Sequence, residues 1–283
     1  DYLRGDTTMS FGYSTSDEND YQADTLNFGI SQDVFGGLTT ISLGYGSGSD
    51  EVSRRGDPVF AEEVDRHAYR LGVTQVLTRN LILGLSYEAV ADEGYLNNPY
   101  RQVRYVDPAD PTSWLTQGEV YPETRASNAV AIRGKYHLPY RAAVSGEYRF
   151  FTDDWGIDAH TVEVGYVHPF RARWLFDVRY RFYTQSAADF FSDLFPYANA
   201  QNYLARDKEL STFQSQGPRA GVTYTFLDRQ GERPLKSTVN LFVDYYMYTY
   251  DDFRDLRADV DAGTEPFYDF DATVVQLFFS LWF

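Results

Sequence analysis

Charged side chains occupy alternate positions in several otherwise apolar stretches of this sequence, a spacing that could line a polar conduit. In an extended strand such residues share one face, opposite the apolar ones. Opposite charges on neighbouring strands can pair, which offsets the cost of burying them, and charges along a pore also set its preference for ions or solutes. The predicted lumen-lining residues are Arg70, Glu88, Arg133, Lys135, Glu147, Arg149, Glu163, Asp177, Arg179, Arg181, Arg219 and Asp244.

Two interpretations of this charged face stay open. In the first, the residues line a narrow or gated channel for small polar solutes or ions. In the second, the strands close into a barrel whose interior is filled by ion pairs and long Arg side chains. The barrel of about twelve strands that is predicted below would be narrow enough for this.

Few residues suggest catalysis. None of the four His is followed two positions later by Ser, the arrangement that barrel phospholipases use. Asp158 and His160 have the Asp-x-His spacing of omptin-like surface proteases, in which a carboxylate can hold a His that acts as a general base toward water. Such a tripeptide is common by chance, so a surface protease is the minor interpretation. We expect no enzyme and no catalytic residue.

The segment Asp251–Asp271 is rich in carboxylates, whose oxygens can bind Ca²⁺. No calcium-site spacing is present, so a solvated acidic loop, bridged to lipopolysaccharide by divalent cations, is the preferred interpretation, and no resident metal or cofactor is predicted. Tyr245, Tyr246, Tyr248 and Tyr250 precede this loop. They fit an aromatic girdle at the membrane interface better than a platform that stacks a ligand.

Strands must position these residues, and period-two alternation recurs along the chain. Val239, Leu241 and Val243, for example, would face one side of a strand and Asn240 and Asp244 the other. Segments near ten residues suit tilted transmembrane strands. Twelve are expected, at Thr7–Ser14, Asp24–Asp33, Thr39–Gly48, His67–Leu77, Leu81–Ala91, Arg125–Leu138, Ala142–Thr152, His160–Pro169, Trp174–Gln185, Arg219–Asp228, Thr238–Tyr250 and Ala272–Phe283.

The connections between these segments alternate in length. Short turns, as at Val34–Leu38 and Arg229–Ser237, alternate with long loops such as Ser49–Arg66, Asp92–Thr124 and Ser186–Pro218. Outer-membrane barrels have this pattern, with the short turns periplasmic, whereas a soluble β-sandwich has no reason to hold all long loops at one end. We therefore predict an all-β, antiparallel up-and-down transmembrane barrel of about twelve strands, a single domain over residues 1–283.

Composition agrees with this class. The net charge of −16 argues against nucleic-acid binding, and the absence of Cys excludes disulfides and thiolate chemistry. Aromatic residues make up 17% of the chain, as suits interfacial belts. No apolar run approaches the roughly 20 residues of a membrane-spanning helix. Because residue 1 is Asp, we expect that an export signal has been removed.

The segment 186–206 is unusually apolar for a long loop and must pack on something: over the barrel mouth, inside the lumen, or on another chain. The charged run that follows could lock it by ion pairs to the wall. The predicted lid residues are Phe190, Phe191, Leu194, Phe195, Arg206, Asp207, Lys208 and Glu209.

Two segments resemble known proteins. The C-terminal strand resembles the assembly signal of bacterial outer-membrane barrels, carried by Val275, Leu277, Phe279, Leu281 and Phe283. The stretch Trp174–Phe213, above all its Arg-Asp-Lys-Glu-Leu-Ser run, resembles a family of bacterial outer-membrane proteins of unknown function. This resemblance covers about the last 125 residues. It implies a barrel that neighbours periplasmic thioredoxin-like and flavin-attachment proteins, and hence a redox partnership.

The sequence thus predicts an integral protein of the bacterial outer membrane. A channel is the first hypothesis, and a non-conducting scaffold that docks periplasmic or surface partners, with redox proteins among the candidates, is the second. The expected partners are outer-membrane lipid, lipopolysaccharide and the barrel assembly machinery, which would bind the C-terminal strand. A periplasmic protein partner is an open possibility.

Overall fold

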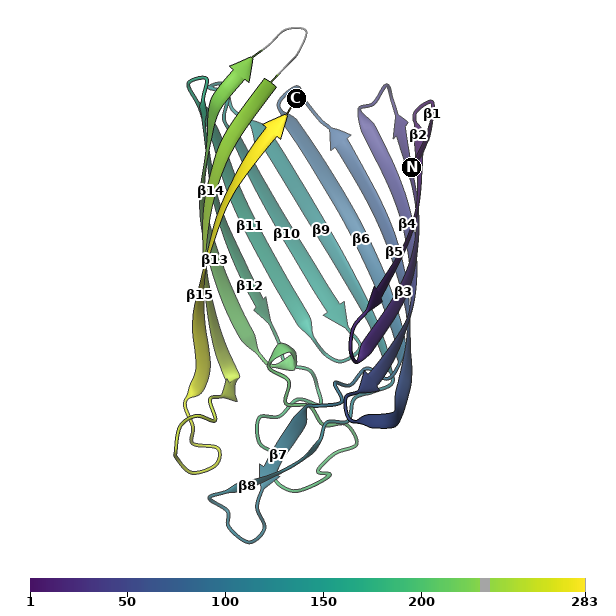
Figure 1. Ribbon diagram of the computed structural model, residues 1–283, viewed down its shortest axis with the longest axis vertical. Coiled ribbons are helices and arrows are strands. Elements are labelled where there is room, and N and C mark those ends of the chain that lie inside the picture. The colour runs from purple at the N-terminus through teal and green to yellow at the C-terminus, as the bar shows by residue number, and fades with distance from the viewer. Residues whose placement is uncertain (230–234, 283) are drawn as a thin grey trace.

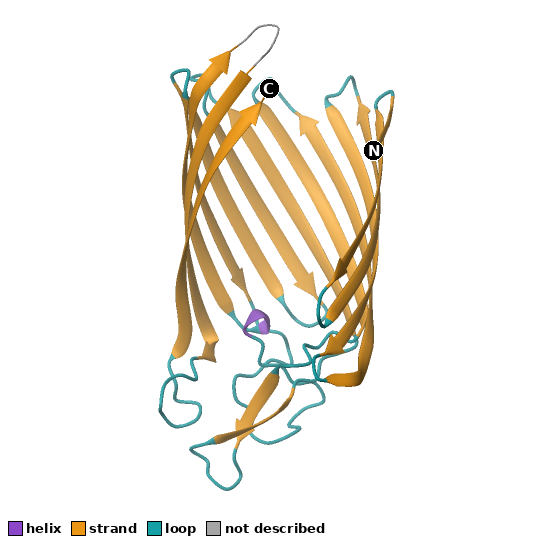
Figure 2. Cartoon of the chain, in the orientation of Figure 1, coloured by secondary structure: helices purple, strands orange, loops and turns teal. Residues whose placement is uncertain are grey.

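The alternating segments fold into long antiparallel strands that follow one another around a curved sheet (Figures 1 and 2). A computed structural model describes residues 1–229 and 235–282. Thirteen strands form the main sheet in chain order, and β7 and β8 form a separate pair. The strands are β1 (Tyr2–Arg4), β2 (Thr7–Asp17), β3 (Tyr21–Val34), β4 (Thr39–Arg54), β5 (Asp57–Val76), β6 (Leu81–Gly94), β7 (Gln102–Val106), β8 (Trp114–Gly118), β9 (Thr124–His137), β10 (Ala143–Asp153), β11 (Asp158–Phe170), β12 (Trp174–Gln185), β13 (Phe213–Arg229), β14 (Leu235–Arg254) and β15 (Phe267–Trp282).

The twelve predicted segments each overlap one long strand of the main sheet, and Trp174–Gln185 coincides with β12. The fifteen strands nevertheless exceed the predicted count of about twelve, because the three-residue β1 and the β7–β8 hairpin add to it. Most of the predicted loop Ser49–Arg66 is paired strand, since β5 already begins at Asp57. Backbone pairing continues there without apolar alternation, because the strands outrun the length that a membrane crossing requires.

A closed barrel is not present among the described residues, which corrects the predicted fold. The last strand, β15, pairs with β14, and the first strand, β1, pairs with β2; β15 pairs with neither β1 nor β2. Figure 1 shows the opening between β15 and the N-terminal strands. Alternation along a strand specifies its two faces but not the partner of an edge strand, so it could not decide closure. Because the sheet is continuous and in chain order, a β-sandwich is excluded.

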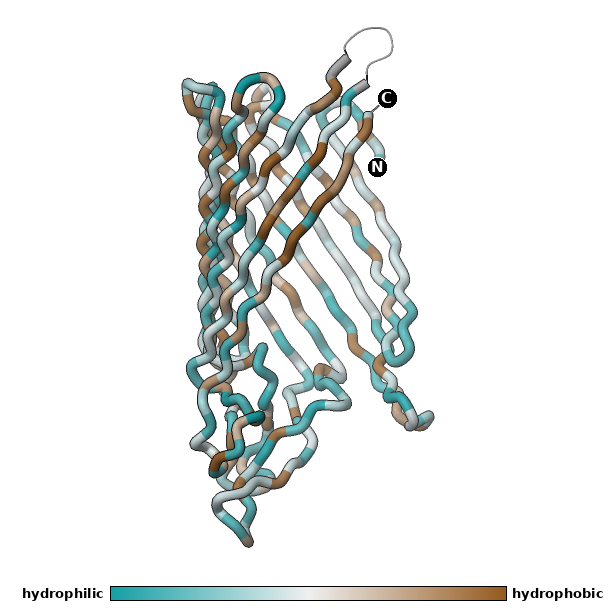
Figure 3. Tube along the Cα trace, turned by 60° about the vertical axis from the view of Figure 1, so that its left-hand side comes forward, coloured by the Kyte–Doolittle hydropathy of each residue, from teal (hydrophilic) through white to brown (hydrophobic). Residues whose placement is uncertain are grey.

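The two faces of the sheet differ in polarity, and hydropathy alternates along the strands (Figure 3). On β15 the outward side chains of Val275, Leu277, Phe279 and Leu281 are between 48% and 71% exposed. Such large apolar groups are stable in that position only against hydrocarbon or another apolar surface. Phe283, the last residue of the predicted assembly signal, lies outside the described residues.

Short turns lie at one end of the sheet and long loops at the other (Figure 1). The turn between β3 and β4 places Phe35, Gly36 and Gly37 at positive φ, which the two glycines adopt without steric cost. The predicted turn Arg229–Ser237 lies partly outside the described residues. At the long-loop end the chain forms β7, β8 and a 3₁₀ turn, η1 (Lys208–Leu210). No helix within the described ranges has the length and hydropathy to cross a membrane.

Candidate functional site: a charged inner face and a loop cap

Strand register brings most of the predicted charged residues into ion pairs on one face of the sheet. Glu147 lies opposite Arg133 in the β9–β10 ladder, and their side chains meet at 2.6 Å. The two side chains are 57% and 29% exposed, so the pair faces open space and is worth at most about 1 kcal/mol. The other pairs on this face are Arg70–Glu88 at 2.7 Å, Arg179–Asp177 at 3.0 Å and Arg219–Asp244 at 2.6 Å, joined by Arg66–Asp92 at 2.5 Å.

The remaining predicted residues of this face form no ion pair within the described ranges. Arg149 instead lies over the ring of Phe151 at 5.5 Å, and Arg181 over Tyr183 at 5.4 Å. Lys135 and Glu163 complete this unpaired group. The twelve predicted residues comprise seven basic and five acidic side chains, a positive balance among these twelve in a chain of net charge −16.

This charged face is concave. One hollow of about 430 Å³ is bounded by Arg70, Glu88, Arg133 and Arg149, over small residues of β4, β5, β6 and β9. A second, also of about 430 Å³, is bounded by Arg133, Lys135, Glu147 and Glu163. Side chains from β4 round to β11 therefore face common space, which only the inside of a curved sheet can provide.

The long loops pack together into a cap at one mouth of the sheet, made of residues 95–123, 186–212 and 255–266 (Figure 1). Its larger apolar cluster holds Tyr121, Trp155 and Phe190, whose rings lie 5.1–5.5 Å apart. A smaller one holds Val103, Phe195 and Leu204, all at most 3% exposed. The cap thus has its own core, which the rim of the sheet shares through Trp155.

Buried and half-buried charges, here called the Asp193 cluster, join the three cap segments: Arg104, Asp193, Arg206, Arg254 and Glu265. Arg104 is 1% exposed and pairs with both Asp193 and Glu265. Arg206 Nη2 reaches Asp193 Oδ1 at 2.9 Å, and Arg254 Nη1 donates to the carbonyl of Glu265 at 2.6 Å. Burial disfavours the charged form of Glu265, but the hydrogen bonds and charge of Arg104 outweigh this and lower its pKa.

The structure places the predicted lid residues within the cap. Phe190 and Phe195 belong to its two apolar clusters, Phe191 packs against the larger one, and Leu194 lies beside Gly263. The charged run fixes the loop by contacts within the loop itself, with a second cap loop and with the wall. Arg206 bonds Asp193, Asp207 pairs with Arg101, Lys208 lies 5.4 Å from the ring of Phe270 on β15, and the Glu209 carbonyl accepts from Gln185.

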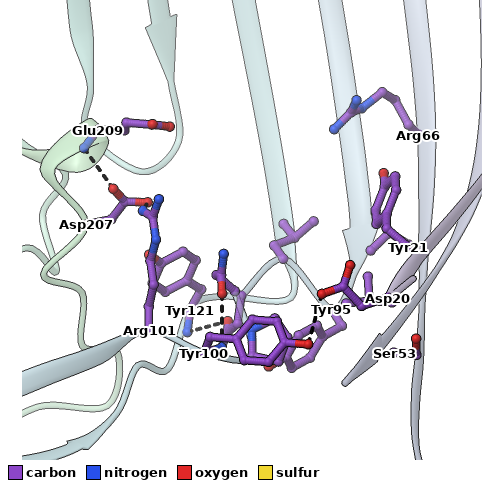
Figure 4. Close-up of a pocket in the computed structure, with 16 residues that line it drawn as sticks. Asp20, Tyr21, Ser53, Arg66, Tyr95, Tyr100, Arg101, Tyr121, Asp207 and Glu209 are labelled. Carbon is purple, nitrogen blue, oxygen red and sulfur yellow. Dashed lines mark hydrogen bonds and ion pairs between the residues drawn. The ribbon is translucent and has the colours of Figure 1, made fainter. Parts of the chain in front are cut away.

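A chamber of about 420 Å³ lies between the cap and the wall (Figure 4). Tyr21 and Arg66 project from β3 and β5, and Tyr100 and Arg101 come from the cap (Figure 4). Tyr100 donates to Asp20 Oδ2 at 2.9 Å, which ties the cap to the rim. The chamber is polar, with Asp207 and Glu209 on its far side (Figure 4).

Tyr121 forms the inner wall of this chamber. Its hydroxyl donates to Glu119 Oε2 at 2.7 Å, and its backbone N–H donates to Asn97 at 2.9 Å. Burial, together with the neighbouring charge of Glu119, raises the pKa of its phenol. Tyr121 therefore stays a neutral hydrogen-bonding group and is a structural part of the cap.

Sequence reasoning missed Arg104, Arg101, Tyr121 and Arg66. Arg104 lies inside a 33-residue stretch interpreted as one loop, whose only signal was the brief alternation Gln102–Val106, now β7. Its carboxylate partner Glu265 is 161 residues away. A single sequence carries no sign of such a long-range pair.

The residues of the minor protease interpretation do not form a catalytic pair. His160 Nδ1 is 2.8 Å from the hydroxyl of Tyr148, and its ring lies against Phe150. Alternation puts Asp158, Tyr148, Phe150 and His160 on the apolar face, away from the charged one. No hydrogen bond joins Asp158 to His160 among the described contacts.

The predicted tyrosine girdle holds for only one of four residues. Tyr245 shares the outward face of β14 with Val243 and Met247, whereas Tyr246, Tyr248 and Tyr250 share the inward face with Asp244. The Tyr246 hydroxyl lies 3.5 Å from Asp244, and Tyr250 is 4% exposed. The prediction grouped all four tyrosines in one belt. Adjacent strand residues such as Tyr245 and Tyr246 point to opposite faces, whereas Tyr246, Tyr248 and Tyr250 share one face.

Three carboxylates of the acidic segment Asp251–Asp271 bind protein groups. Asp252 accepts from the Thr212 N–H, and Glu265 pairs with Arg104. Asp255 pairs with Arg257, which holds the pKa of this carboxyl at about 2. Across residues 1–229 and 235–282, no three His, Cys, Asp or Glu side chains are grouped as a metal site would require.

Sequence comparison relates the chain to a known family. The sequence profile of a family described as a protein of unknown function, DUF3570, matches residues 1–261. The match extends far beyond the resemblance at Trp174–Phe213 and ends before the C-terminal strand, β15, begins at Phe267. None of the curated proteins compared with the chain matches it in sequence.

One of the similar solved structures supports a shared fold. The siderophore receptor PirA from Pseudomonas aeruginosa is 11% identical, with a TM-score of 0.56; the match covers 98% of this chain and 51% of the receptor, so the chain spans about half its length. CdiB from Escherichia coli is 10% identical, with a TM-score of 0.48 and coverage of 93% and 47%. OmpT of Vibrio cholerae is 9% identical, with a TM-score of 0.44 and coverage of 98% and 99%. The likeness to PirA shows the strand arrangement of an outer-membrane barrel.

Proposed function

We propose that this chain, which belongs to the DUF3570 family of proteins of unknown function, is an integral outer-membrane barrel. In this proposal it conducts small polar solutes and prefers anions. One observation carries this proposal: the twelve predicted charged residues of the concave face have a positive balance, while the convex face is apolar. Charges along a polar passage favour solutes of opposite sign.

The proposal includes closure of the sheet in the membrane. The free edges of β15 and of the part of β2 beyond its pairing with β1 carry backbone N–H and C=O groups that cannot bond to hydrocarbon, and each such group costs several kcal/mol, on the order of 2–7. The two strands run antiparallel to each other, as a closing pair in an even-numbered barrel must. We infer one domain closed by these two strands.

A second candidate is a non-conducting scaffold. The cap supports it, since the loops cover one mouth and the β7–β8 hairpin extends away from the sheet, where a partner could reach it (Figure 1). On this view the charged face only stabilises the barrel. Periplasmic partners, lipopolysaccharide and the assembly machinery remain proposals for either candidate.

Planar-bilayer recording of the purified full chain separates the two candidates. We expect discrete openings with anion preference, and we expect the double variant Arg149→Glu/Arg181→Glu to prefer cations, because it changes the charge of the lining by four. Arg257→Glu, which alters an exposed cap residue by two charges, is the matched control. Silence of the native chain and of a chain with the cap opened, together with a co-purifying protein, would establish the scaffold instead.

A further inference from the structure

Aromatic rings recur along the inward face of β13, β14 and β15. The series begins at Phe213 near the cap and ends at Trp282 near the short turns. The register pairs Tyr248 with Phe270 and Lys236 with Trp282 across the last two strands. The members of this series, called the aromatic track, are Phe213, Phe242, Tyr246, Tyr248, Phe270, Phe278 and Trp282.

The rings of the track contact one another in pairs. Tyr248 and Phe270 stack with centroids 4.5 Å apart and planes 6° apart, and Phe242 and Phe278 stack at 5.8 Å and 14°. Phe213 lies 6.4 Å from Tyr248. Each stacked pair uses one face of each ring and leaves broad apolar surface toward the space inside the sheet; Phe278 is 48% exposed.

Basic side chains accompany the track along its whole length. Lys208 of the cap lies 5.4 Å from the ring of Phe270, and Arg219 lies 5.5 Å from Phe242. Lys236 lies 5.5 Å from Trp282 at the other end. Arg219 is paired with Asp244, and Lys236 lies opposite Asp228 in the β13–β14 register. Aromatic faces and cations therefore alternate from the cap to the short-turn end.

The opposite wall differs in side-chain size. On β4, β5 and β6 the same inward face carries small residues, among them Ser42, Gly44, Gly72 and Ser86. One wall thus offers flat apolar rings, while the other leaves room beside them. A flat solute with polar edges fits that combination better than a bare ion, which gains little from an uncharged ring.

A purely structural role accounts for part of the track only. Tyr246 covers Gly217, and Phe242 covers Gly221 so closely that a Cβ on Gly221 would clash with its ring, while a Cβ on Gly217 would be tight against Tyr246. Such aromatic cover stabilises a glycine-containing strand. No glycine lies opposite Tyr248, Phe270 or Phe278 in the register, so their rings need another explanation.

We propose that the aromatic track binds acidic oligosaccharides, such as chains of uronic acids, as they pass along the inside of the sheet. Sugar rings present C–H groups on their faces, which pack on aromatic rings, and their carboxylates pair with the Lys and Arg side chains along the track. This inference rests on the proposed function, since it names the solute class of that same passage.

Binding of trigalacturonate by the full chain in detergent micelles tests the proposal, with maltotriose as the neutral probe. We expect calorimetry to show trigalacturonate bound at least about tenfold more tightly than maltotriose. Tyr248→Leu/Phe278→Leu keeps apolar bulk but removes flat faces and should weaken binding about tenfold or more. Tyr245→Leu, on the outward face of the same strand, should leave binding unchanged. Lys208→Gln/Lys236→Gln should abolish the preference for the acidic probe.

The outcomes distinguish this inference from the proposed function. Circular dichroism of each variant shows whether it has folded, and binding in micelles does not require conduction. Equal affinity for both probes would overturn the acidic class. Absence of binding, or binding unaffected by Tyr248→Leu/Phe278→Leu in a folded variant, would overturn the track altogether, while anion conduction without saccharide could still stand.

Discussion

Replacing Asp193 with Ala is expected to release the cap. Asp193 is the carboxylate that Arg104 and Arg206 share, and the variant would leave a buried guanidinium at Arg104, 1% exposed, with Glu265 as its one remaining carboxylate partner. Breaking a buried pair in this way costs about 3–5 kcal/mol, far more than loss of a surface pair. Since the cluster joins all three loop segments, the loss falls on the cap rather than on the strand ladders.

Limited proteolysis of the folded protein measures this release. We expect cleavage within residues 186–212 to accelerate at least about a hundredfold in Asp193→Ala, because local opening becomes several kcal/mol easier. The same variant should raise mean conductance in planar bilayers. Asp255→Ala is the matched control, since its partner Arg257 is 77% exposed. If both variants were cleaved at the native rate, the Asp193 cluster would not hold the cap.

Closure of the sheet is expected to appear as a disulfide within one chain. Each of three variants carries Cys in place of Ser10 on β2 and a second Cys at Gln276, Phe278 or Ser280, which are inward positions of β15. In the membrane, one of these three cysteine pairs should form a disulfide nearly completely. Disulfides require Cα atoms within about 7 Å, so efficient formation reports adjacent strands. The native chain has no Cys, which removes any background.

Electrophoresis without reductant separates the possible results. Ser10→Cys/Gly29→Cys joins known register partners of β2 and β3 and gives the positive control. Ser10→Cys/Ser145→Cys places the two cysteines on β2 and β10, strands that are not neighbours in the sheet, and should stay reduced. A disulfide that links two chains at the β15 positions would show that the open edges pair between copies, and closure within a chain would then be wrong.

The strands were largely predictable because each one carries its own signal. Trp174–Gln185 was identified to the residue, since apolar and charged side chains alternate through its middle, from Phe176 to Phe182. The extension of β5 back to Asp57 was not, because the acidic residues there have no apolar partners in alternation. Pairing outside the membrane is decided by the neighbouring strand, which a local pattern does not contain.

The site was predictable in its wall and not in its cap. The parity that placed Glu147 and Arg133 on one face also made them neighbours, because adjacent strands are joined by short turns. Arg104 and Glu265 meet through loop packing over 161 residues, and no period encodes such a contact. The aromatic track was predictable only in part. The tyrosines of β14 were noted in the sequence, but they were assigned to an interfacial girdle without regard to the two faces of the strand.

The central claim is that water occupies the charged side of each strand and lipid the other, and β10 tests it most directly. Single cysteines placed in turn from Val144 to Arg149 would be exposed to a membrane-impermeant thiol reagent in intact outer membranes. The account predicts that Ser145, Glu147 and Arg149 positions react while Val144, Gly146 and Tyr148 positions do not, an alternation of period two. Uniform reactivity along β10, or labelling confined to the Val144 parity, would contradict it.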